Sequence, residues 1–287
     1  MNIKNSLVEN IKRIAQVPSF STFEDRLHPV VTEFIGNLPH WKGRIQAVAD
    51  NNLVIHYQGQ KKGRPPAFTA HLDKINHWGR KYPQTLDFEF KNGQLVAQLD
   101  DAAGVGLLLT LVEKAADLEL PEFYLYFSEV EENISYKVDR NLLRDKGLGL
   151  YSGIGADRIS QNIIFNKEEP AYCLTVDTTP VFKGQSGVAL YSAFWEKSEF
   201  SPSDELIHLT GYIRDAILKA FPFVQSSNNT NDYIDYGLSF NSKNGTVPSL
   251  ALEPGIFPYH QKIEGVYLED LEKCFDILVF LLKEVEI

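Results

Sequence analysis

The sequence places histidines and carboxylates, the side chains that bind divalent cations, directly after several apolar runs. His71 follows the run Phe68-Thr69-Ala70 and stands two residues before Asp73. This arrangement suits a metal ligand with its own orienting carboxylate, because the second ring N–H of a ligating histidine needs a partner that fixes the tautomer. An ordinary histidine at a strand end would look the same, so the motif needs support from the rest of the chain.

A second acidic motif, Asp100-Asp101, stands just before a strongly apolar helical stretch. One interpretation is a helix N-cap followed by an acid in the first turn. The other is a carboxylate that bridges two cations, with Gly104 and Gly106 allowing the backbone to pack closely.

A third motif, Glu131-Glu132, follows a short apolar run, and Glu129 brings the count to three acids within four residues. Neighbouring carboxylates repel each other unless a cation or a proton separates them, although a solvated acidic loop is also possible. The competing pair Glu168-Glu169 follows a polar stretch and precedes a proline, and we interpret it as a solvated turn.

Two further polar residues complete the set: Asp177 ends an apolar run, and His260 precedes Glu264 and the final helix. Imidazole and carboxylate ligands without cysteine describe a catalytic zinc, manganese or cobalt site rather than a structural one. Five ligands and one spare glutamate suit two cations better than one. The residues from which such a site would be built are His71, Asp100, Glu131, Glu132, Asp177 and His260.

Strands that alternate with helices must position these residues. Apolar runs predict strands at 44–48, 53–56, 67–70, 123–127, 172–176, 188–194 and 249–252. Helical spacing predicts two helices in the first forty residues and others at 103–116 and 268–282, and Asn92-Gly93 predicts the turn of a hairpin over 86–99. This order predicts a three-layer α/β/α sandwich of the phosphorylase/hydrolase type around a mixed, largely parallel sheet, with ligands at the carboxyl ends of the strands.

Composition excludes several classes of protein. The formal charge of −10, from 28 Lys+Arg against 38 Asp+Glu, argues against nucleic acid or an anionic membrane surface as partner. A hydrophobic content of 44% supports a large core, and neither a membrane span nor a secretory leader is expected. Cys173 and Cys274 form no disulfide framework, so we expect a cytoplasmic enzyme with reduced thiols. Without a shift in composition, residues 1–287 are predicted to form one domain.

The order of the motifs resembles the co-catalytic dizinc aminopeptidases (zinc peptidase clan MH) and their deacylase and carboxypeptidase relatives. The resemblance covers nearly the whole chain, including Pro18-Ser19-Phe20-Ser21-Thr22-Phe23-Glu24 and Asp50-Asn51-Asn52-Leu53. Its ordered motifs are His71-x-Asp73, Asp100-Asp101-x-x-Gly104, Glu131-Glu132, Asp177 and His260.

The resemblance implies a role for each of these residues. Asp73 would orient the ligand His71, and Asp100 would bridge both metals, often with a cis peptide after it. Glu131 would be the general base. The remaining ligands would be Glu132 on one metal, Asp177 on the other, and His260.

The spacing of the motifs favours the compact branch of this family. Only 29 residues separate His71 from Asp100, and 83 separate Asp177 from His260, which leaves no room for an inserted dimerisation or lid domain. The 45 residues between Glu132 and Asp177 are longer than the family pattern, so an insertion near 136–167 could shape the substrate pocket or contact another subunit.

The resemblance implies an aminopeptidase with two Zn²⁺, or Mn²⁺ or Co²⁺, acting on a peptide or small amide. An acid must then hold the α-amine, and Glu129, Asp232 and Asp235 are the candidates. A dipeptidase, N-acyl amino acid deacylase or carboxypeptidase would use the same site. A glutaminyl cyclase-like acyltransferase and a binding module that has lost its metals also stay open, and a homo-oligomer is possible.

Overall fold

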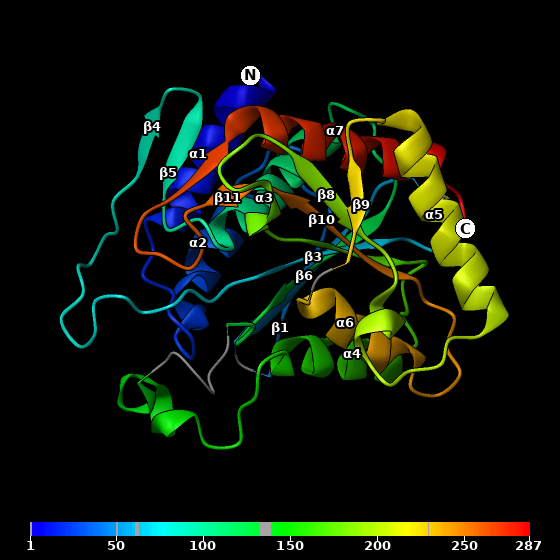
Figure 1. Ribbon diagram of the computed structural model, residues 1–287, viewed down its shortest axis with the longest axis horizontal. Coiled ribbons are helices and arrows are strands. Elements are labelled where there is room, and N and C mark those ends of the chain that lie inside the picture. Colours follow the sequence, from blue (N-terminus) through cyan, green and yellow to red (C-terminus); the bar gives the residue numbers. More distant parts are fainter. Residues whose placement is uncertain (1, 50, 61–62, 133–138, 229) are drawn as a thin grey trace.

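A large mixed sheet forms the middle of the molecule (Figure 1). The computed structural model describes residues 2–49, 51–60, 63–132, 139–228 and 230–287, and within these ranges the sheet has eight strands in the order β1-β2-β6-β3-β7-β10-β8-β9. The strands are β1 (Gly43–Val48), β2 (Asn52–Tyr57), β3 (Ala67–His71), β6 (Phe123–Ser128), β7 (Cys173–Val176), β8 (Val188–Tyr191), β9 (Gln225–Ser227) and β10 (Ser249–Pro254).

The four central strands, β6, β3, β7 and β10, are parallel to one another. Each is buried along its whole length, as expected of parallel strands that are covered on both faces. The outer strands β2 and β8 pair antiparallel with β6 and β10. The parallel centre therefore delivers four strand ends to one edge of the sheet.

Helices cover both faces of the sheet. Figure 1 shows α1 (Ile3–Ala15), α3 (Ala102–Ala115) and α7 (Leu268–Glu284) on one face, with α4 (Ile154–Asn166) and α6 (Asp232–Asn241) on the other. The buried residues of α2 (His28–Gly36) and α5 (Asp204–Ala220) include members of the same core cluster as α1, α3 and α7. The predicted three-layer α/β/α sandwich is confirmed.

Two glycines let α3 approach its neighbours. A Cβ on Gly106 would lie 2.5 Å from Cγ1 of Ile11 on α1, and a Cβ on Gly104 would lie 2.4 Å from the Asp101 carboxylate. Neither position has room for a side chain. The close packing predicted for this helix is therefore correct.

A second sheet, which the sequence did not predict, contains four strands among the described residues, in the order β11-β12-β5-β4. The hairpin of β4 (Glu89–Lys91) and β5 (Gln94–Ala97) turns at Asn92-Gly93, as predicted. β12 (Glu264–Tyr267) pairs with β5, and β11 (Ile256–Phe257) pairs with β12. This small sheet brings the chain before Asp100 next to the loop that carries His260.

Part of the predicted insertion over 136–167 lies outside the described residues. From 139 onward it forms two short 3-10 helices, Arg140–Leu142 and Arg144–Gly147, followed by α4. Cys173 and Cys274 are buried free thiols. Across the part of the chain that the structure describes, no helix is both long enough and apolar enough to cross a membrane.

Candidate metal centre

The parallel strands gather the predicted site at one edge of the large sheet. His71 ends β3, Glu131 and Glu132 follow β6, and Asp177 follows β7. Because β6, β3 and β7 are adjacent and parallel, their carboxyl ends meet at the same edge. Asp100 lies just before α3, and His260 lies between β11 and β12.

Two groups of ligand atoms converge there. The first contains His71, Asp101 and Asp177, and the second contains Asp100, Glu132 and His260; within each group the ligand atoms lie within 4.8 Å of one another. All five ligands predicted from the sequence are included, together with Asp101. Their oxygen and imidazole donors fit divalent cations such as zinc.

Asp100 connects the two groups through its two carboxylate oxygens. Oδ1 lies 3.2 Å from Nε2 of His71, and Oδ2 lies 3.3 Å from Nε2 of His260. Nε2 of His260 is also 3.5 Å from Oε2 of Glu132. The peptide between Asp100 and Asp101 is cis, as the family resemblance implied. Asp100 is therefore placed as a bridging carboxylate would be.

Asp101 has the first of the two roles that the sequence left open for this motif, the helix N-cap. Its Oδ1 accepts a hydrogen bond from the Gly104 backbone N–H at 2.7 Å, so it is the N-cap of α3. Its Oδ2 is buried and has no hydrogen-bond partner among the described residues. A cation held with His71 and Asp177 would satisfy that oxygen.

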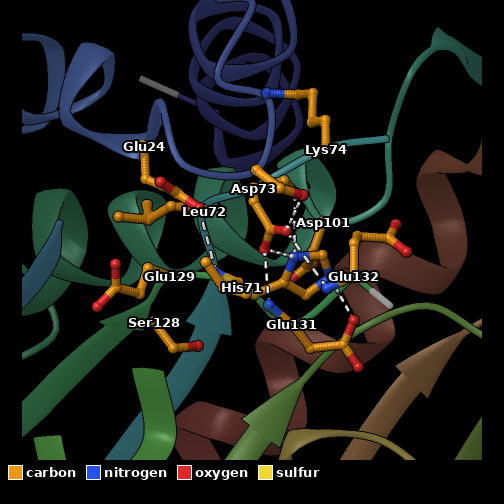
Figure 2. Close-up of polar contacts among 12 residues, drawn as sticks. Glu24, His71, Leu72, Asp73, Lys74, Asp101, Ser128, Glu129, Glu131 and Glu132 are labelled. Atoms are coloured by element: carbon orange, nitrogen blue, oxygen red, sulfur yellow. Dashed lines mark hydrogen bonds and ion pairs between the residues drawn. The ribbon is translucent and has the colours of Figure 1, made fainter. Parts of the chain in front are cut away.

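Asp73 is fully buried and orients both His71 and the Glu131-Glu132 turn (Figure 2). Its Oδ1 lies 3.3 Å from Nδ1 of His71 and accepts the backbone N–H of Glu131 at 3.0 Å. Its Oδ2 accepts the Glu132 N–H at 3.3 Å and the Ser21 hydroxyl at 2.6 Å. One carboxylate thus links the predicted base to a predicted ligand.

Burial and repulsion shift the titration of the centre. Burial, followed by the charge of Asp100, raises the pKa of Asp177 to about 8. Burial likewise raises the pKa of Glu131 and Glu132 well above the usual range. Burial opposes ionisation of Asp100 as well, yet hydrogen bonds from His260 and His71 hold its pKa below the usual range. The centre holds more carboxylates than the two imidazoles can balance, so divalent cations would stabilise it.

Two buried acids near the centre were not assigned a role from the sequence. Glu264 accepts the backbone N–H groups of Leu99 at 2.8 Å, Asp100 at 3.1 Å and Gln261 at 3.0 Å. It therefore fastens the Asp100 segment to the His260 loop. The signal that could have found it is a glutamate within an apolar run, Glu264-Gly-Val-Tyr, since such a charge is seldom buried without a reason.

The second of these acids, Glu253, lies on β10 beside β7. In the parallel register Leu252 pairs with Val176, so Glu253 is the neighbour of Asp177. It accepts a hydrogen bond from Asn231, and burial followed by the charge of Asp177 raises its pKa. Its sequence signal is the same, a glutamate directly after the apolar Leu250-Ala-Leu252 run.

Two other acidic motifs lie outside the centre. Glu129 accepts hydrogen bonds from Asn51 at 2.9 Å and Asn52 at 2.7 Å, and it pairs with Arg158 at 2.5 Å. Glu168 pairs with Arg44 on β1. Neither belongs to the two convergent groups found among the described residues.

Comparison with known proteins identifies the fold. No protein-family model matches the chain, and no curated protein matches its sequence. The aminopeptidase APDkam598 of the archaeon Desulfurococcus kamchatkensis is 15% identical, with 99% of this chain and 96% of that one covered and a TM-score of 0.69. The aminopeptidase PepT of Bacillus cereus is 14% identical over 97% of this chain and 98% of its own, with a TM-score of 0.64.

A third similar structure is the TET1 peptidase of Pyrococcus horikoshii, described as assembling into a tetrahedron or a large octahedral shell. It is 15% identical over 97% of this chain and 100% of its own, with a TM-score of 0.63. These likenesses establish the fold, and they agree with the family resemblance found in the order of the motifs.

Proposed function

We propose that this chain is a metal-dependent aminopeptidase that removes N-terminal residues from peptides. The observation that carries the proposal is the pair of ligand groups joined by Asp100, with Glu131 beside them but in neither group. The Glu131 carboxylate lies 3.9 Å from Nε2 of His71, close enough to act on a molecule bound at the first group.

The proposed ligands of two divalent cations, zinc first among them, are His71, Asp100, Glu132, Asp177 and His260, with Asp101 as a further candidate. Cations held there would polarise the scissile carbonyl and lower the pKa of water. Glu131 would accept a proton from the attacking water and pass it to the leaving amine. Asp73 would keep Glu131 and His71 in position through the contacts described above.

Of the acids near the centre, Asp232 is best placed to hold the α-ammonium group of a substrate. Glu129 is already paired with Arg158 and two amides. Asp232 is buried, accepts the Ser128 hydroxyl at 2.6 Å through Oδ2, and has no described partner for Oδ1. Ser128 is the register neighbour of His71, and the charge of Asp232 contributes to the raised pKa of Glu131. Asp235, one helical turn further along α6, lines a cavity with Asp157 and Ser239, neither of which belongs to a ligand group.

The substrate would be a peptide or small amide, and residues 1–287 would act as one catalytic domain in the cytoplasm. Assembly of several copies would agree with the description of the TET1 peptidase as forming shells. The substrate class, the single domain, the cytoplasmic location and the assembly are part of this proposal, and each can be tested separately from the activity.

Aminoacyl-anilide substrates, each with an N-acetylated counterpart, test the proposal together with metal content by elemental analysis. We expect cleavage of the free-amine substrates and two zinc ions per chain. Asp232→Asn should raise KM for free-amine substrates about 10-fold, because one charged interaction is removed, and should leave the metals in place. Faster cleavage of the acetylated substrates would reject the aminopeptidase and favour the deacylase.

A further inference from the structure

The turn that carries Glu131 is held by an unusual set of backbone hydrogen bonds. Three consecutive N–H groups donate to carboxylates that come much earlier in the chain (Figure 2). The N–H of Val130 donates to Oε1 of Glu24 at 3.2 Å, and those of Glu131 and Glu132 donate to Asp73. The direction in which Glu131 projects depends on these contacts.

Val130 needs such support because of its backbone conformation. Its φ is 53°, in the left-handed region, where a β-branched residue is strained by roughly 1–3 kcal/mol. Its carbonyl accepts the Gly153 N–H at 3.0 Å, and its side chain is buried with Leu143 and Ile154. Val130 is therefore fixed by three contacts: a hydrogen bond to its carbonyl, the packing of its side chain, and the hydrogen bond from its N–H to Glu24.

Glu24 is fully buried, and it lies outside both ligand groups. Its Oε1 accepts the backbone N–H of Thr22 at 2.8 Å as well as that of Val130, and Thr22 also has a positive φ, 73°. Its Oε2 is buried and has no hydrogen-bond partner among the described residues. Burial and the charge of Asp73 raise its pKa, so the neutral form is favoured. Glu24 can therefore affect the candidate centre through the backbone of Thr22 and Val130, to which it is hydrogen-bonded.

We propose that Glu24 is a positioning residue that fixes the Val130 turn and thereby the orientation of Glu131. The catalytic part of this inference rests on the proposed function, because it takes Glu131 to be the base. The structural part, that Glu24 holds the turn, stands on the hydrogen bonds alone. Glu24 belongs to the Pro18–Glu24 motif, and this role explains why an acid ends that motif.

Glu113 offers a matched control. It is partly buried and accepts Ser6 Oγ and Asn10 Nδ2, each at 2.9 Å, so it joins α1 to α3 much as Glu24 joins two segments. It lies near the far end of α3, roughly 16 Å along the helix from Ala102 at a rise of about 1.5 Å per residue. Its loss should therefore destabilise the fold without moving Glu131.

The experiment compares Glu24→Ala, Glu24→Gln and Glu24→Asp with Glu113→Ala. Hydrogen exchange by mass spectrometry follows a peptide that contains Val130–Glu132, and kinetics on an aminoacyl anilide give kcat and KM. In the Ala variant we expect faster exchange of that peptide and a kcat about 10- to 100-fold lower, because small misplacements of a catalytic group are costly. KM and metal content should change less than about twofold, because Glu24 bonds to no proposed ligand and the Glu132 N–H keeps its hydrogen bond to Asp73.

The conservative variants separate positioning from folding. Glu24→Gln keeps an oxygen that accepts both N–H groups, so it should retain most of the kcat and the slow exchange. Glu24→Asp is shorter and should behave like the Ala variant. If Glu24→Ala does not fold, the contrast between Gln and Asp decides the question.

Unchanged exchange of the Val130–Glu132 peptide in Glu24→Ala and Glu24→Asp would overturn the proposal, as would an equal effect of Glu113→Ala on that peptide. If the wild-type protein cleaves no substrate, the proposed function fails. The exchange measurements then still decide whether Glu24 holds the turn.

Discussion

Glu129 and Glu131 lie two residues apart at the end of β6, yet their surroundings differ. Glu129 is buried and surrounded by donors, with Arg158, Asn51 and Asn52 on its two oxygens. Glu131 faces His71 at 3.9 Å and stands among the acids of the candidate metal centre. Burial alone therefore does not mark a functional carboxylate in this protein. The distinguishing feature of Glu131 is that its surroundings lack enough positive charge to balance the acids.

The largest effect should come from Glu131→Gln. If Glu131 is the general base, kcat should fall by about 10²- to 10⁴-fold while the metal content stays the same, because the amide cannot accept the proton. Steady-state kinetics with elemental analysis measures both. Glu132→Gln is the companion variant and should lose metal, since Glu132 belongs to the second ligand group. Equal metal loss in the two variants would show that their roles are misassigned.

A smaller effect, on stability rather than on rate, is expected for Glu129→Gln. The neutral amide cannot pair with Arg158 or accept from both asparagines, so the free energy of unfolding should fall by about 1–3 kcal/mol. Denaturant titration measures this change, and kcat should stay within about twofold because Glu129 contacts no candidate ligand. A raised KM for free-amine substrates at unchanged stability would instead make Glu129 the amine-binding acid and break the comparison.

A further effect, expected in metal-free protein, concerns the pH dependence of stability. In metal-free protein, burial raises the pKa of Asp177 and of Glu264 to about 8, far above the values of unfolded acids. The folded state then binds more protons than the unfolded state, so stability should fall as the pH rises from about 5 to about 8. Lys74, whose pKa burial lowers to about 7, opposes this trend only above that pH.

Denaturant titration of chelator-treated protein at about pH 5.5 and about pH 7.5 measures the slope. Added zinc should flatten this slope, because metal binding would replace the proton of the proposed ligand Asp177. A metal-free protein that is more stable at the higher pH would show that the centre is not an excess of buried acid.

The sequence predicted the large sheet and the convergence of the five candidate ligands because parallel strands are uniformly apolar and end abruptly in polar residues. The helices α4, α5 and α6 were not predicted. The buried faces of α4 and α6 are interrupted by polar residues such as Ser160 and Asn241, which weakens the helical period. The small sheet was missed because β11 and β12 have two and four residues, too few for a periodic signal.

The supporting contacts of the centre were beyond reach from sequence for a different reason. Glu24 and Val130 are 106 positions apart, and Glu264 and Asp100 are 164 apart. Only the folded topology brings them together. By contrast, the roles suggested for Asp73 and Asp101 depend on near neighbours in the chain, and the local motif was sufficient to indicate them.

The candidate centre lies on a joint between two sheets. His71, Asp101 and Asp177 lie at the end of a strand of the large sheet or at the start of the helix packed on it, whereas the second group requires His260 from the loop between β11 and β12 of the small sheet. Glu264 connects the two sheets at this point, because it accepts backbone N–H groups from the Leu99–Asp100 segment and from Gln261 in the His260 loop. A displacement of the small sheet relative to the large one would leave the His71–Asp101–Asp177 group intact and would separate His260 from Asp100 and Glu132. The two ligand groups therefore differ in what holds them together. The first depends on the large sheet and its helix alone, and the second depends also on the hydrogen bonds of Glu264.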